Sequence, residues 1–185
     1  MHRNAFRKIP VIGVEDGSFR KGITRKAKLA AVLFLETKIE GVRITEVTVD
    51  GVDATEALLK MIEGWSFGAV LLSGVSFAGF NIIDPTLVHE ECGKPVVVTS
   101  RTRPDNVSVK RALRRHFKDW EMRWSIFEKL GEVYEVQVMD GTEPVYIEVV
   151  GETGEWARGL IQALSFCGRM PEPLRVARLI ARGIS

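Results

Sequence analysis

Four aspartates of this 185-residue chain stand where predicted strands end or where the following loops end, and together they could hold a metal ion. They are Asp16, Asp50, Asp53 and Asp84. In an open α/β sheet, functional sites gather at the carboxyl ends of the strands, where loops converge. Carboxylate oxygens are the ligands that hard divalent cations such as Mg²⁺ prefer. Because such ions promote phosphodiester hydrolysis, metal-dependent phosphodiester cleavage is the chemistry that we expect from these residues.

Each of these acids also has a purely structural interpretation. Asp16 and Asp50 each precede a glycine and could shape a turn. Asp53 and Asp84 each stand just before a predicted helix, where an aspartate side chain can cap the first free N–H groups. Glu15 alternates with Asp16 along a strand, so we expect it to point to the opposite face. The shared placement at strand ends supports a site, with these predicted members: Asp16, Asp53 and Asp84 as catalytic residues, and the same three with Asp50 as metal ligands.

Positive charge is concentrated in two blocks that flank an acidic one, although the net charge is only +2. Residues 1–28 carry a net charge of +6 and residues 101–123 carry +5, whereas residues 29–100 carry −6. This distribution favours a surface that binds phosphates beside clustered carboxylates, and solvated faces are the alternative interpretation. The predicted nucleic-acid contacts are Arg20, Lys21, Arg101, Arg103, Lys110, Arg111, Arg114 and Arg115.

The hydrophobic pattern predicts the elements that position these residues. Strands are expected at residues 8–15, 28–36, 42–50, 68–73, 94–99, 132–139 and 143–149. Helices are expected to begin at residues 53 and 84 and to span 106–118, 119–130, 153–167 and 173–182. Three sequential strands followed by strand–helix units predict an α/β fold with a mixed sheet, a βββαβαβα core, helices on both faces, and a C-terminal hairpin and helices.

Composition and missing motifs narrow the class of protein. At 45% hydrophobic and 27% charged residues, the chain is typical of a globular protein, and its length predicts a single domain over residues 1–185. No apolar run is long enough for a membrane helix or a signal peptide, so we predict a cytoplasmic protein with reduced, mostly buried thiols at Cys92 and Cys167. The absence of GxxxxGK[ST], GxGxxG and GxSxG sequences argues against ordinary nucleotide hydrolases, dehydrogenases and α/β-hydrolases.

Four segments resemble an archaeal family long catalogued as domain of unknown function ninety-nine. They are VIGVEDGSF at 11–19, VTVDGVDAT at 47–55, GAVLLSGVSFAGFNIID at 68–84 and KPVVVTSRTRP at 94–104. That family is distantly similar to endonuclease V, the repair nuclease that acts beside deaminated bases, and its members are linked to endonuclease activity on deoxyuridine in DNA. The resemblance implies a ribonuclease-H-like fold, which agrees with the predicted order of strands and helices.

The resemblance also implies roles for particular residues and departs from endonuclease V at two places. Asp16 matches the first-strand aspartate of endonuclease V, and Asp53 matches its glutamate at the first helix start, with Asp50 as the competing choice. The third acid lies in an Asp-Gly pair after the fourth strand, but this chain has Ser73-Gly74 there, which leaves Asp84 to substitute. The lysine expected after the next strand is replaced by Thr99, Ser100 and Arg101.

These observations lead to one preferred prediction and two alternatives. We expect an endonuclease dependent on Mg²⁺ or Mn²⁺ that acts on deaminated, uracil-containing DNA in repair. The first alternative, motivated by Ser73, is a nucleic-acid-binding module on the same fold with weak or absent catalysis. The second is a protein that binds a small molecule or a protein partner and uses its acids only as helix caps. The choice between DNA and RNA and the oligomeric state are left open.

Overall fold

Seven strands form one mixed sheet in the computed structural model, which describes residues 3–185. Their order across the sheet is β3-β2-β1-β4-β7-β9-β8. The bounds are Val11–Asp16 for β1, Lys26–Leu35 for β2, Lys38–Thr48 for β3, Ala69–Leu72 for β4, Val96–Ser100 for β7, Tyr134–Val136 for β8 and Val145–Val150 for β9. A separate two-stranded ribbon pairs β5 (Ser76–Phe77) with β6 (Asn81–Ile82).

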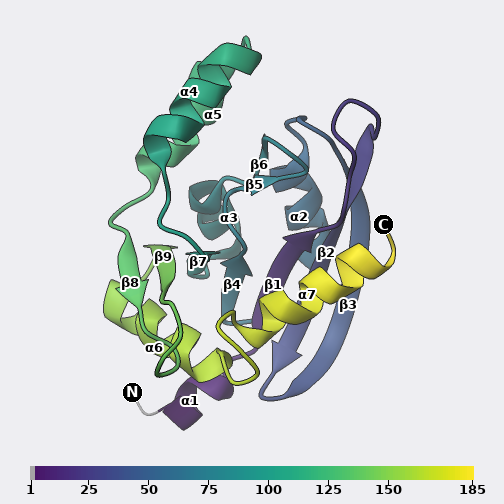
Figure 1. Cartoon of the computed structure of the whole chain (residues 1–185). Helices are drawn as coiled ribbons and strands as arrows, with labels where there is room; N and C mark the ends of the chain where they lie inside the picture. Colours follow the sequence, from purple (N-terminus) through teal and green to yellow (C-terminus); the bar gives the residue numbers. More distant parts are fainter. Residues whose placement is uncertain (1–2) are drawn as a thin grey trace.

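The strand directions confirm the predicted mixed sheet. β1, β2 and β3 form the expected antiparallel meander, and β1, β4 and β7 run parallel to one another. α2 (Ala54–Ile62) and α3 (Pro85–Cys92) cover one face, and α6 (Gly154–Leu164) and α7 (Glu172–Gly183) cover the other (Figure 1). The short α1 (Arg3–Arg7) packs against α6. Helices therefore lie on both faces of the sheet, as predicted.

The alternation of side chains along β1 distributes its residues between two separate cores. Ile12 and Val14 belong to the core under α2 and α3, whereas Val11 belongs to the core under α6. Gly13 faces α7 so closely that a Cβ at this position would lie 2.4 Å from the backbone carbonyl of Pro173. Glycine is therefore required there, because α7 lies directly on the strand.

The loops that matter for function lie together at one end of the strands. Because β1, β3, β4 and β7 point the same way, the loops at residues 17–25, 49–53, 73–84 and 101–105 all lie at their carboxyl ends (Figure 1). Beyond β7, the chain forms α4 (Asn106–His116) and α5 (Trp120–Lys129), which project from the sheet as a pair of helices (Figure 1). We call α4 and α5 together the basic arm.

Several elements differ from the prediction in detail. The 74–81 segment, expected to be a plain connection, contains the β5–β6 ribbon, and α1 was not predicted. The strand expected at 42–50 begins at Lys38 and ends at Thr48, so Asp50 lies in the following loop. Both cysteines are free; Cys92 is half-buried, but Cys167 is exposed, whereas burial was predicted for both. No helix among residues 3–185 has the length and apolar character needed to cross a membrane.

Candidate active site and nucleic-acid interface

Asp16 and Asp50 both bind the same turn of the chain, at residues two positions apart. The Ala78 N–H donates to Asp16 Oδ2 at 2.6 Å, and the Phe80 N–H donates to Asp50 Oδ1 at 2.9 Å. Ala78 and Gly79 hold left-handed φ values of 44° and 85°. A Cβ at Gly79 would lie 2.2 Å from Asp50 Oδ1, so glycine allows the carboxylate to approach the turn. The 78–80 turn thus anchors one carboxylate on either side of Gly79.

The two aspartates reach this turn from different elements. Asp16 is the last residue of β1, and Asp50 follows β3 with a left-handed φ of 58°. The Asp50 N–H also donates to Ala78 O at 2.8 Å, so backbone and side chain both fix its position. Burial raises the pKa of Asp16, and the N–H of Ala78 opposes that rise by stabilising the ionised form.

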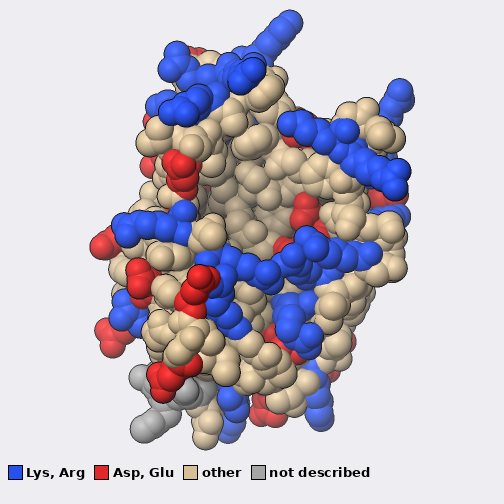
Figure 2. All heavy atoms as spheres, in the orientation of Figure 1, with Lys and Arg blue, Asp and Glu red and all other residues tan. Residues whose placement is uncertain are grey.

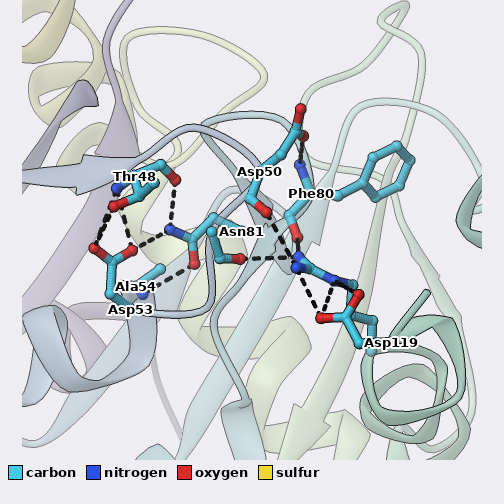
Figure 3. A network of polar contacts seen from close by, with 9 residues as sticks. Thr48, Asp50, Asp53, Ala54, Phe80, Asn81 and Asp119 are labelled. Atoms are coloured by element: carbon cyan, nitrogen blue, oxygen red, sulfur yellow. Dashed lines mark hydrogen bonds and ion pairs between the residues drawn. The ribbon is translucent and has the colours of Figure 1, made fainter. Parts of the chain in front are cut away.

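A buried arginine holds the loops around these carboxylates. Arg123 is 5% exposed and comes from α5. Its guanidinium donates to Gly51 O at 2.8 Å, to Asp50 O at 3.1 Å and to Phe80 O. Asp119, one turn earlier, forms an ion pair with it at 3.0 Å and keeps its charge compensated (Figure 3). The basic arm therefore fixes the loop after β3 and the 78–80 turn at once.

Asp53 lies near this network, but its carboxylate is turned away from Asp50 (Figure 3). It accepts hydrogen bonds from Thr48 N at 3.1 Å, Thr48 Oγ1 at 2.8 Å and Asn81 Nδ2. These hydrogen bonds lower its pKa, although partial burial opposes them. Asp53 does precede α2, as predicted, but its side chain does not cap the helix, because Asn81 Oδ1 accepts the N–H of Ala54 instead. Asp53 closes the β3–α2 loop.

Asp84 caps a helix, which is the structural alternative that the sequence analysis gave for it. It caps α3 by accepting the N–H groups of Thr86 at 2.9 Å and Leu87 at 3.2 Å, and it forms an ion pair with Lys129 at 3.4 Å. Among the described residues, no group of three or more His, Cys, Asp or Glu side chains is arranged to hold a metal ion. The expected convergence of Asp16, Asp53 and Asp84 therefore does not appear as a cluster among residues 3–185, and Asp16 and Asp50 share the 78–80 turn instead.

This pair suits a hard cation. Asp16 and Asp50 each use one oxygen for the 78–80 turn. Within residues 3–185, the second oxygen of each carboxylate accepts no hydrogen bond or ion pair from another residue's side chain or backbone. Mg²⁺ is commonly held by one or two carboxylates together with waters and substrate phosphates, so two free oxygens fit the requirement. A site with three carboxylates is not needed for this mode of binding.

A second polar site lies on the opposite face of the same strand end. Glu15, adjacent to Asp16, faces α7 and lines a cavity of about 140 Å³ with Ser73, Thr99, Arg101, Arg175 and Arg178. We call this cavity the arginine pocket. Desolvation, assisted by the charge of Asp16, raises the pKa of Glu15 to about 8 in spite of the surrounding arginines. The prediction that Glu15 points away from Asp16 is correct, but its place in a pocket was missed.

The α7 contribution to this pocket was also missed, although the sequence contains a signal for it. Arg175, Arg178 and Arg182 are spaced by three and four residues, which places them on one side of a helix. Parallel pairing of Val14 with Leu72 brings Glu15 beside Ser73, where the endonuclease V acid was expected. Only the folded chain brings these strand ends against α7.

Basic side chains border a hollow on this side of the molecule. Figure 2 shows Lys and Arg atoms over the basic arm, over the loop after β1, and in a band across α7, with a hollow between them. Arg20, Lys21 and Arg103 are exposed in loops, and Arg101 belongs to the arginine pocket. On α4, Lys110 forms an ion pair with Glu128 at 3.7 Å, and Arg114 lies over the Trp120 ring at 5.1 Å. Arg111 and Arg115 are exposed.

Solved structures similar to this chain share its whole fold. A protein of unknown function from Archaeoglobus fulgidus has a TM-score of 0.84 and 32% identity, with 96% of this chain and 98% of that chain covered. The catalytic domain of human endonuclease V has a TM-score of 0.63 and 17% identity, covering 97% of this chain and 86% of that chain. Endonuclease V from Ciona intestinalis, in complex with inosine-containing DNA, has a TM-score of 0.62 and 13% identity over 92% and 83% of the two chains. The predicted ribonuclease-H-like fold is thus confirmed.

Sequence comparisons identify the family. A UPF0215 protein from Pyrococcus furiosus is 35% identical over 190 residues, which cover 100% of this chain and 96% of that protein. Another from Methanothermobacter thermautotrophicus is 33% identical over 194 residues, covering 100% and 94%. Residues 7–185 match the family described as Endonuclease dU. This chain belongs to the endonuclease dU family.

Proposed function

We propose that this protein is a metal-dependent endonuclease that cleaves DNA containing uracil. Membership of the endonuclease dU family and the endonuclease V fold support a nuclease. The observation that carries the proposal is the pair of carboxylates, Asp16 and Asp50, anchored on the 78–80 turn at the carboxyl edge of the sheet. Figure 2 shows a hollow on this side of the molecule that is bordered by basic side chains, which attract a polyanion.

The roles of the residues follow from their contacts. Asp16 and Asp50 would hold Mg²⁺ or Mn²⁺ through their free oxygens, while the 78–80 turn keeps both carboxylates oriented. When bound, a divalent cation supplies positive charge that stabilises a phosphodiester under attack. Arg123 holds the 78–80 turn and the loop after β3 in fixed positions relative to each other, so it is a positioning residue. Arg20, Lys21, Arg111 and Arg115 would neutralise phosphates along the strand.

A cleavage assay on the full-length protein tests this proposal. Duplexes that contain one uracil, one inosine or neither are incubated with Mg²⁺, Mn²⁺ or EDTA. We expect cleavage of the uracil duplex only when a divalent cation is present. Asp16→Asn and Asp50→Asn should each reduce the rate on the order of a thousandfold, because each removes a charge that acts in the transition state.

Asp140→Asn is the matched control, since Asp140 is exposed in the hairpin loop far along the chain from the site. It should cleave like the wild type. Cleavage that survives both Asp16→Asn and Asp50→Asn, or that proceeds unchanged in EDTA, contradicts the proposal. Equal cleavage of all three duplexes would support a nuclease but reject uracil as its target.

A nucleic-acid-binding protein without catalysis is the second candidate. Two observations favour it: no third acid joins Asp16 and Asp50 among residues 3–185, and Ser73 stands at the place of the third endonuclease V acid. This candidate predicts DNA binding that weakens steeply with salt, but no metal-dependent product. The same assay, accompanied by binding measurements at several salt concentrations, separates the two.

A further inference from the structure

The arginine pocket contains buried polar atoms that lack hydrogen-bond partners, as expected of a binding site. It lies where β1, β4 and β7 end, and α7 covers it. Among residues 3–185, three side-chain oxygens or nitrogens are buried without a hydrogen-bond partner. Two of the three, Glu15 Oε2 and Thr99 Oγ1, belong to residues that line this one cavity. Glu15 is 8% exposed and Thr99 is 1% exposed. Buried polar atoms are usually paired, so unpaired ones in a cavity indicate that a ligand supplies the partners. The Thr99 hydroxyl can donate to an anionic ligand, whereas Glu15 Oε2 can do so only when the carboxyl group is protonated.

The charges around the cavity specify an anion. Arg101, Arg175 and Arg178 are in its wall, and Glu15 is the carboxylate in that wall, 3.9 Å from Arg178 Nε. Arg175 is already paired with Glu172, at 2.8 Å from Nε to Oε2. Desolvation lowers the pKa of Arg101, the positive charges of Arg178, Arg169 and Arg182 add to this effect, and the charge of Glu15 opposes it. Three arginines and one carboxylate therefore line the pocket, which favours an anionic ligand over a cationic or purely apolar one.

The donor geometry favours a tetrahedral oxyanion. Guanidinium groups present several N–H donors in a planar fork that matches phosphate oxygens. The hydroxyl groups of Ser73 and Thr99 can add donors from the strand ends below. Because α7 carries Arg175, Arg178 and Arg182 on one side, the cationic groups continue from the pocket along the helix toward the exposed surface (Figure 2).

We propose that the arginine pocket binds one internal backbone phosphate of the nucleic-acid strand that occupies the hollow, an inference that rests on the proposed function. Glu15 and Asp16 are consecutive residues of β1 that face opposite sides of the sheet. A phosphate in the pocket would therefore fix the strand at the sheet edge, and a neighbouring phosphodiester would lie against Asp16 and Asp50. The pocket sets the register of the strand relative to the two carboxylates.

Binding without metal tests the pocket independently of cleavage. Single-stranded and duplex oligonucleotides with one neutral methylphosphonate linkage, moved stepwise along the strand, are titrated by fluorescence anisotropy in EDTA. The wild type should lose affinity about tenfold at one linkage position, the size expected for loss of a charge-assisted contact. Arg178→Gln and Thr99→Val should bind the unmodified strand more weakly and should lose this positional effect.

Arg158→Gln is the matched control, because Arg158 is exposed on α6, which covers the same face of the sheet. It removes an equal charge and should keep the positional effect. Arg178→Lys, which restores the charge but not the fork, should recover part of the affinity and confirms that the variants fold. Thermal melting of each variant provides a second check on folding.

Three outcomes would overturn the assignment. The first is a positional effect that Arg178→Gln leaves unchanged. The second is competition by inorganic phosphate or a 5′-phosphate while internal linkages have no effect. The third is loss of the effect on removal of a base and not on neutralisation of a phosphate. The two proposals fail separately. If no substrate is cleaved but the positional effect is present, the nuclease proposal fails and the pocket stands, whereas cleavage that depends on Asp16 without a positional effect rejects only the pocket.

Discussion

The two faces of the sheet meet at the end of β1 and present different chemistry there. On the α2 and α3 side, Asp16 and Asp50 are oriented by backbone N–H groups, and each keeps an oxygen for a ligand. On the α7 side, Glu15 is buried among arginines, and its pKa is raised to about 8. Adjacent acidic residues thus differ because strand alternation sends them to different surroundings. For Glu15 and Asp16, position in the strand rather than residue type therefore decides the surroundings of each acid.

Substitution of Arg123 should impair the site of Asp16 and Asp50 but should leave the arginine pocket on the other face unchanged. Arg123→Met leaves the carbonyls of Asp50, Gly51 and Phe80 without their donor, so we expect the free energy of unfolding to fall by about 4 kcal/mol. Cleavage should fall with it, because Asp50 loses its orientation, whereas the positional effect of a neutral linkage should persist. Denaturant unfolding and the two assays above measure this. Arg158→Met, on the exposed surface of α6, should leave all three unchanged.

Glu15 should make the stability of the protein depend on pH. Its folded pKa, about 8, is above the ordinary pKa of 4.5 expected in the unfolded chain, so the folded state retains a proton that the unfolded state releases. The free energy of unfolding should therefore fall as pH rises through this window, by about 3 kcal/mol between pH 4.5 and 7 from this residue. Burial is the main cause of the raised pKa, the charge of Asp16 adds to it, and Arg178, Arg182 and Arg101 oppose it.

Glu15→Gln should flatten this pH dependence and should be more stable than the wild type at pH 7. Denaturant unfolding at pH 5, 7 and 8 provides the measurement. Glu155→Gln, at an exposed position on α6, serves as the control and should follow the wild-type curve. Parallel curves for Glu15→Gln and the wild type would show that the two acids at the end of β1 do not differ in the way described.

The smallest effect on stability is expected at Asp84, which belongs neither to the site of Asp16 and Asp50 nor to the arginine pocket. Asp84→Ala removes the cap of α3 and should lower the free energy of unfolding by about 1 kcal/mol, without changing the cleavage rate. Asp84→Asn retains a capping oxygen and should leave both quantities close to the wild type. A large loss of cleavage in Asp84→Asn would restore this residue to the site and would contradict the assignment to Asp16 and Asp50.

Much of the fold could be predicted, because its signals are local. Period-two alternation and continuous apolar runs located the strands, and Asp84 followed by Pro85 marked the start of α3 correctly. The candidate site was predicted less well. Asp16 is predicted from its place at a strand end, and Asp53 is preferred to Asp50 because it matches the endonuclease V glutamate at the first helix start. Helix capping and turn formation, the structural alternatives for these two acids, are both short-range patterns. Neither pattern reveals that Asn81 binds Asp53 or that Phe80 binds Asp50.

The sequence by itself determined the order of strands and helices, the opposite orientations of Glu15 and Asp16, and the positive charge on α4. Each depends on residues within a few positions of one another. Only the tertiary structure decided which acids meet, because the 78–80 turn reaches Asp16 across 62 positions and Arg123 reaches Gly51 across 72. The arginine pocket likewise joins Thr99 and Arg101 to α7, and no local periodicity encodes contacts between segments that meet only when the sheet has formed.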